Sequence, residues 1–259
     1  MRLQLAVFLF ASFSSLANPT QAQQTLAPRD PQAMNLLALS FAAMGGSKLP
    51  GIRDTDIRAQ VIRPRMGGAI PFAVRIRTLG TKKLRVDADS PEGPVVVWVN
   101  GKRAARKVAA NEAETFSSLS MGGVGVVQVP VFSVLTEWND AATSLKYIGL
   151  ENSVSASLHH IRVMPNADAD VPLELRTPLD VYLDAQSLLV AKLVYPARPP
   201  SNLRQSVPVE VSYSDYRAVS GLLIPLHVTY SLRGQIISEY RITSVAVNQG
   251  VREEEFEVR

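Results

Sequence analysis

The sequence contains no cysteine, and only three of its 259 residues are histidine. Without cysteine the chain cannot form a disulfide, bind an iron–sulfur cluster or a thiolate-ligated zinc ion, or carry an acylated N-terminal cysteine. A secreted protein of this size does not need disulfides, because a single domain of this length can bury a sizeable core.

Charge is also scarce. Charged residues make up 19% of the chain, the formal net charge is +4, and aromatic residues do not alternate with the basic ones. This composition excludes an obvious nucleic-acid-binding surface. The densest basic cluster is GKRAARK, Gly101–Lys107, directly after Asn100. We interpret it as a solvated hairpin; the alternative is a docking patch for acidic headgroups or an acidic partner.

The first 28 residues carry one charge, on Arg2. The apolar run Leu3–Leu16 falls short of the ~20 residues that a membrane span needs, and a small residue, Ala22, follows it. This order predicts a secretory signal peptide over residues 1–22, with the mature N-terminus near Gln23 and a periplasmic location. Losing Arg2 lowers the formal charge from +4 to +3.

A complete set of helix signals follows. Asp30 is suited to the N-cap, Pro31 to the first helical position, and Gly45 to the left-handed exit. The segment between them has apolar side chains nearly all round: Met34, Leu36, Leu37, Leu39, Phe41 and Met44. A helix of this kind must be surrounded by protein. We therefore predict a core helix over Pro31–Met44.

Beyond residue 70 the pattern changes to a period of two, which is typical of strands with one buried and one solvated side. The Asn100-Gly101 pair predicts a hairpin, Gly122–Gly125 a loop, and Pro130–Asp140 a second short helix. Strands are expected over 72–76, 84–88, 95–99, 145–150, 153–164, 179–183, 188–196, 207–213, 222–232 and 236–247. Short joins between consecutive strands predict one antiparallel domain over residues 23–259.

The segment Leu222–Leu232, LLIPLHVTYSL, has the longest alternation. Every second residue from Leu222 is apolar or aromatic, whereas the residues between them are mostly polar or proline. A strand with so long an apolar face needs a helix or an apolar ligand to cover it.

Motifs for catalysis are missing. The sequence has no phosphate-binding loop and no G-x-S-x-G elbow. His159 and His160 are adjacent on an expected strand and point to opposite faces, and His227 lies on the polar face of another, so we expect structural or solvent-facing roles. Asp180 and Asp184, about 13 Å apart on a strand, are too distant for a glycosidase pair and are interpreted as turn formers. No metal, cofactor or enzymatic activity is predicted.

The order of motifs resembles that of the LolA/LolB-like superfamily of periplasmic lipoprotein carriers, which includes outer-membrane lipoprotein-sorting proteins and related sigma-regulatory sensors. Besides the first helix, five segments carry the resemblance: PFAVRIRTLGTKKLRVDAD, GLENSVSASLHHIRV, LDVYLDAQSLLVAKLVY, YSDYRAVSGLLIPLHVTYSLRGQ and ITSVAVNQGVREEEFEV. They cover most of the mature chain, and the final Asn248-x-Gly250 followed by Phe256 is the most telling.

The resemblance implies a mainly β fold, a curved half-open antiparallel barrel closed by a few helices, whose cavity holds acyl chains. We expect that cavity to be lined by Leu37, Phe41, Phe72, Trp138, Leu222, Ile224, Leu226 and Val228. The expected partner is the acyl chain of a lipid or lipoprotein, with an inner- or outer-membrane protein as a further partner and the chain itself a monomer. The alternatives are a sensor or scaffold module that binds a protein, and a secreted hydrolase.

Overall fold

The computed structural model describes residues 27–64, 68–121, 138–154, 156–164, 178–199 and 201–257. Within these ranges thirteen strands form one sheet, accompanied by one α-helix and short 3-10 turns. In chain order the elements are α1 (Pro31–Met44), η1 (Gly46–Gly51), β1 (Asp54–Arg63), β2 (Ile70–Leu79), β3 (Lys83–Ser90), β4 (Gly93–Asn100), β5 (Arg103–Val108), β6 (Glu114–Ser117), η2 (Ser118–Met121), β7 (Ser144–Asn152), β8 (Ser157–Met164), β9 (Leu179–Asp184), β10 (Val190–Ala197), β11 (Val207–Val219), β12 (Leu222–Leu232), β13 (Gln235–Val247) and η4 (Glu253–Phe256).

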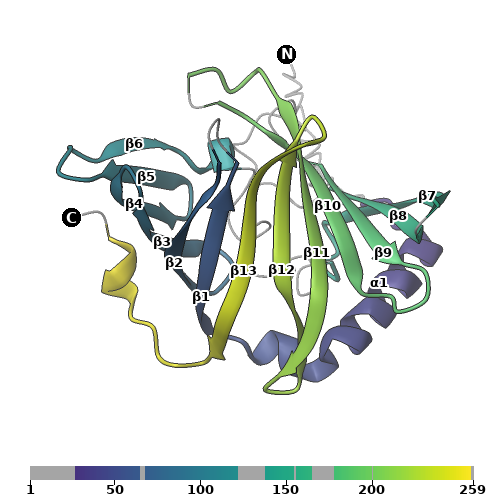
Figure 1. Cartoon of the computed structure of the whole chain (residues 1–259). Coiled ribbons are helices and arrows are strands. Elements are labelled where there is room, and N and C mark those ends of the chain that lie inside the picture. Colours follow the sequence, from purple (N-terminus) through teal and green to yellow (C-terminus); the bar gives the residue numbers. More distant parts are fainter. Residues whose placement is uncertain are drawn as a thin grey trace, which may run out of the picture.

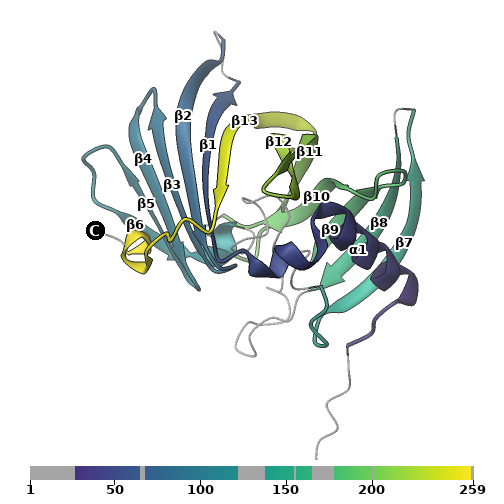
Figure 2. The ribbon, with the colours of Figure 1, turned by 90° about the horizontal axis from the view of Figure 1, so that it is seen from below.

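The sheet is an antiparallel meander that returns on itself. Its order is β6-β5-β4-β3-β2-β1-β13-β12-β11-β10-β9-β8-β7, so the first and last strands of the chain pair in the middle. Strands β6 and β7 are its two edges among the described residues. Seen from below, the sheet is an arc that does not close (Figure 2). The predicted mainly β, curved and half-open fold is confirmed.

Helix α1 begins and ends where the sequence predicts. The Asp30 carboxylate accepts hydrogen bonds from the backbone N–H groups of Gln32 and Ala33, at 2.8 and 3.1 Å. Gly45 ends the helix with a φ of 143°, and a Cβ at this position would lie 2.6 Å from Leu222 Cδ2. Glycine is therefore required here by both the backbone conformation and the close approach of β12. No helix in the described ranges is long and apolar enough to cross a membrane.

The helix packs against the concave face at one end of the sheet. It contacts β12 and β7, which lie far apart in the strand order, and this is possible because the sheet curves around it (Figure 1). Leu37, Met44 and Ile224 are fully buried, in one apolar cluster with the inward-facing residues of the strands. One continuous core therefore joins the helix to the arc of strands.

Several strand bounds differ from those expected. Strand β1 was missed, although Ile57, Ala59 and Val61 alternate with polar residues and are buried. Strand β11 continues to Val219, because its pairing with β12 persists where the apolar alternation stops, and Asp215 adopts a φ of 51° within it.

The remaining differences are smaller. The expected strand 153–164 begins at Ser157, after the turn that joins β7 to β8, and β10 begins at Val190 because Leu188 has a positive φ. The Asn100-Gly101 hairpin is confirmed as the join of β4 and β5. The predicted loop 122–125 and most of the predicted second helix, residues 130–137, lie outside the described residues.

Candidate functional site

The concave face carries a cavity of about 320 Å³ over strands β1 to β5 and β13. Arg63, the last residue of β1, lies at this cavity, so the cavity sits at the end of β1 opposite to η1 and α1. The described residues that line it are mostly apolar, and none of them is acidic: Arg63, Phe72, Val74, Val86, Ala88, Ser90, Val95, Val97, Arg106 and Tyr240.

The alternation of side chains along each strand explains why the walls of this cavity are apolar. In the sheet Val74 faces Ala88 and Val86 faces Val97, so one residue in two from each strand points to the concave side. Val86, Ala88, Val95 and Val97 are only half-buried, whereas a core position of the same type would be fully covered. The strands thus present an apolar surface that the described protein does not completely cover.

A row of side chains extends from this cavity across the arc. Register pairs Phe72 with Val61, Val61 with Tyr240, Tyr240 with Val228, and Val228 with Tyr213. All five are inward-facing members of the core or pack against it. One row of apolar and aromatic side chains therefore connects the cavity wall at Phe72 and Tyr240 with Val228 of the segment Leu222–Leu232.

Aromatic hydroxyl groups on the concave face are held neutral. Burial raises the pKa of Tyr240, with Arg63 opposing that rise, and burial raises the pKa of Tyr213 and Tyr230 well above their ordinary value. The rings of Tyr230 and Tyr240 are 5.2 Å apart. Desolvation disfavours the phenolate, so these tyrosines, which are neutral at pH 7 even with an ordinary pKa, stay protonated well into the alkaline range.

The polar groups of the cavity are few. The guanidinium carbon of Arg63 lies 5.2 Å from the centre of the Phe72 ring, a cation–π arrangement. Arg106 lies on β5, opposite Val97 in register, and its side chain is exposed. The Ser90 hydroxyl donates to the carbonyl of Gly93 at 2.7 Å and is already occupied. Sequence reasoning missed Arg63 because it missed β1; the alternation of that strand was the available signal.

The eight residues predicted to line a cavity fall into two groups. Leu37, Leu222 and Ile224 are at most 2% exposed where α1 meets β12, and they form a packed core there. Phe41, Leu226 and Trp138 are half-buried against the same core. Phe72 and Val228 lie farther along the sheet in the cross-strand row, and Phe72 lines the concave cavity. Their role in holding a ligand stays a prediction.

The histidines and aspartates have structural partners. His159 faces Tyr147, whose hydroxyl lies 3.1 Å from its Nδ1, and His227 Nδ1 lies 2.9 Å from the Ser214 hydroxyl. His160 is buried, with Nδ1 2.8 Å from Glu151.

The interpretation of the two aspartates as turn formers is right for one and wrong for the other. Asp184 accepts hydrogen bonds from the N–H groups of Gln186 and Ser187 in the turn after β9. Asp180 instead lies within β9 and binds His160 and Arg162, at 3.0 and 2.8 Å. In the sequence, an aspartate that pairs with a cation across a strand looks the same as one that forms a turn, and this is why Asp180 was misinterpreted. No group of three or more His, Asp or Glu side chains in the described ranges is placed to hold a metal ion.

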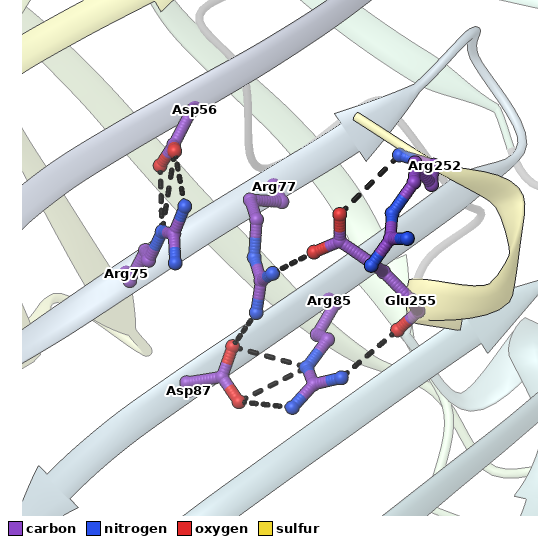
Figure 3. Close-up of polar contacts among 7 residues, drawn as sticks. All are labelled: Asp56, Arg75, Arg77, Arg85, Asp87, Arg252 and Glu255. Atoms are coloured by element: carbon purple, nitrogen blue, oxygen red, sulfur yellow. Dashed lines mark hydrogen bonds and ion pairs between the residues drawn. The ribbon is translucent and has the colours of Figure 1, made fainter. Parts of the chain in front are cut away.

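The convex face carries an ionic network that holds the C-terminal turn η4 against β2 and β3 (Figure 3). Arg77 is 7% exposed and pairs with both Asp87 and Glu255. Arg85 binds Asp87 through two nitrogens and donates to the backbone carbonyl of Glu255 at 3.1 Å. Because Arg77 and Arg85 each contact both Asp87 on β3 and Glu255 in η4, the network holds the C-terminal segment against the sheet.

A second cavity, of about 560 Å³, lies where this segment meets β4, β5 and β6. Phe256 and Trp98, which are 1% and 5% exposed, form part of its wall, and Arg103 and Thr115 are at its margin. The indole Nε1 of Trp98 is buried without a hydrogen-bond partner among the described residues. Asn100 and Glu257 also line this cavity.

No protein-family model matches the sequence. No curated protein matches it either. Solved structures do resemble the fold. A domain from Vibrio parahaemolyticus assigned to outer-membrane lipoprotein-sorting proteins aligns over 87% of this chain and 96% of its own, at 9% identity and a TM-score of 0.55.

Two further structures agree with it. A LolA superfamily protein from Nitrosomonas europaea has 9% identity and a TM-score of 0.56, and a DUF1329 family protein from Desulfovibrio piger has 13% identity and a TM-score of 0.53. Each aligns over 87% of this chain and 97% of its own length. The chain therefore has a LolA-like fold. Because the sequence identities are low, the likeness concerns the fold alone.

Proposed function

We propose that this protein is a periplasmic carrier or binding protein for the acyl chains of a lipid or lipoprotein. The observation that supports the proposal is the concave cavity whose walls are apolar side chains left half-buried on the inside of the arc. Its volume, about 320 Å³, falls at the lower end of the range of small-molecule sites. The names of two fold neighbours, a lipoprotein-sorting domain and a LolA superfamily protein, agree with it.

Energetics favour an acyl ligand on such a surface. Each methylene removed from water contributes about 0.8 kcal/mol, so four methylenes contribute about 3 kcal/mol. A whole acyl chain would then bind at micromolar concentration or better after the cost of association. The cavity offers no reactive constellation, so we assign binding and not catalysis.

The test is uptake of a neutral, environment-sensitive acyl-site probe such as N-phenyl-1-naphthylamine by delipidated protein. Val97→Trp fills the cavity from β4, whereas Val96→Trp, one residue earlier, points to the convex face. Losing contact with two methylenes, about 1.6 kcal/mol, should weaken acyl binding more than tenfold in Val97→Trp only. Val228 is a poorer position for this test because it is 6% exposed and a larger side chain there would disturb the core.

Three outcomes are informative. Equal melting temperatures for the two variants with binding lost in Val97→Trp alone support the proposal, as does acyl lipid found by mass spectrometry in protein purified from its own compartment. Equal binding by both variants contradicts the assignment of the cavity. If the delipidated wild type takes up no probe, the carrier proposal fails, and a protein-binding module becomes the better hypothesis, with the convex cavity beside Trp98 as its site.

A further inference from the structure

Two guanidinium groups adjoin the apolar concave cavity, and we propose that they bind the anionic head of its ligand. The ligand would be an anionic amphiphile, with an acyl chain on the apolar wall and a carboxylate or phosphate at the positively charged margin that Arg63 and Arg106 form. This inference rests on the proposed function, since it names the chemical class of the ligand at that same site.

The charge balance of the cavity is the first argument. Among the described residues its lining includes Arg63 and Arg106 and no acidic side chain. Neither arginine has a carboxylate partner in the part of the chain that the structure describes, although Glu114 faces Arg106 in register on β6. Six other arginines of the sheet do pair with carboxylates: Arg75, Arg77, Arg85, Arg162, Arg217 and Arg241.

Both guanidinium groups are exposed and line one cavity, so they make its margin positively charged. An anion at this margin is attracted by both charges and accepts charge-assisted hydrogen bonds from the guanidinium groups. A cationic or zwitterionic head would find no acidic side chain in this lining. A neutral head would gain no attraction between opposite charges.

The geometry of Arg63 is the second argument. Its guanidinium is 5.2 Å from the centre of the Phe72 ring, and it is close enough to Tyr240 to lower the pKa of that hydroxyl. Resting on an aromatic face orders the planar group; the Tyr240 hydroxyl takes one of its hydrogen bonds, and a guanidinium has further N–H donors for a ligand. Arg63 is itself exposed, at the end of β1, so the head would lie at the solvent end of the cavity.

The structure shows where the side chains of the basic cluster Gly101–Lys107 point. Alternation along β5 sends Arg106 to the concave side, opposite Val97, and Arg103 to the cavity on the convex side. One cluster in sequence is therefore divided between two surfaces. The comparison of these two arginines supplies a matched control on a single strand.

The experiment measures displacement of the neutral probe from delipidated protein by dodecanoate, dodecan-1-ol, dodecyl phosphate and inorganic phosphate. Wild type should bind the two anionic amphiphiles about tenfold more tightly than the alcohol, and this preference should fall as sodium chloride is raised. Arg106→Gln and Arg63→Gln should each lose most of the preference and keep the affinity for the alcohol. Arg103→Gln should behave as wild type.

The outcomes separate this inference from the proposed function. If acid and alcohol bind equally in wild type and in both glutamine variants, the anionic head is refuted while acyl binding stands. If inorganic phosphate alone competes as well as dodecyl phosphate, the arginines form a free-anion site and the amphiphile is refuted. If neither the probe nor dodecanoate binds, both proposals fall. If Arg103→Gln loses the preference instead, the head lies on the other face and this assignment is wrong.

Discussion

At the scale of single residues, Arg77 shows how this sheet tolerates a buried charge. Its guanidinium is 7% exposed on the convex face and is paired with Asp87 on β3 and with Glu255 in η4. Removing one partner of such a group leaves charge without compensation, which is more destabilising than the net value of the pair. The sequence segment KKLRVDAD shows the residue types but gives no indication that a C-terminal glutamate completes the network.

Asp87 should make stability depend on pH in the acid range. Burial by itself raises its pKa, but hydrogen bonds from Arg85 and Arg77 outweigh this and hold the pKa below its usual value. Because the pKa is lower in the folded state, the contribution is complete above the unfolded value of about 3.9 and is lost as pH falls through the folded pKa.

We therefore predict that Asp87→Asn lowers the free energy of unfolding by about 2 kcal/mol at pH 7, the value of hydrogen bonds to a charged group. The difference between variant and wild type should shrink as pH falls below about 4. Urea unfolding at pH 7, 5 and 3 measures it. Asp89→Asn, at an exposed position on the same strand, is the control. A difference that is constant with pH would contradict the assigned role of the carboxylate.

At the scale of elements, the α1 helix is the part that the sequence describes best. Its N-cap, first proline, apolar body and terminal glycine all act locally, so sequence determines both ends. Strands are less well determined, because their ends depend on pairing. Strand β11 continues through polar residues to Val219 since β12 offers partners up to Leu222.

Leu37→Asp distinguishes a fixed helix from a movable one. Leu37 is fully buried in the apolar core, so an aspartate there must enter an apolar site as a charge or take up a proton. We predict a loss of several kcal/mol in the free energy of unfolding. Asn35→Asp, at an exposed position of the same helix, should melt as wild type. Unchanged melting of Leu37→Asp with probe binding lost would instead show that α1 is a lid.

At the scale of the whole molecule, the chain combines a predicted export signal with a curved sheet. Residues 1–26 lie outside the described ranges, so the signal peptide remains a prediction from sequence. Isolated from the host compartment, the protein should begin near Gln23. N-terminal sequencing measures this directly, and a retained Met1 would contradict both cleavage and the periplasmic location.

The sequence by itself determined the fold class, which is mainly antiparallel β. Alternation with a period of two predicts antiparallel strands, Asn100-Gly101 predicts a hairpin, and the cap residues place α1, because each of these signals acts between near neighbours in the chain. The alternation of apolar and polar residues in Leu222–Leu232 also predicted that this strand has one apolar face. It predicted that something must cover the strand, without indicating what.

Only the tertiary structure decided where that apolar surface is open. Leu222 and Ile224 are closed off by α1, whereas Val97 remains half-buried on the opposite wall. It also brought Arg63 and Arg106 to one cavity, although 43 positions separate them in the sequence. These placements depend on the β1–β13 pairing and on the curvature of the sheet, which join segments far apart in the chain, and local sequence patterns carry no information about such contacts.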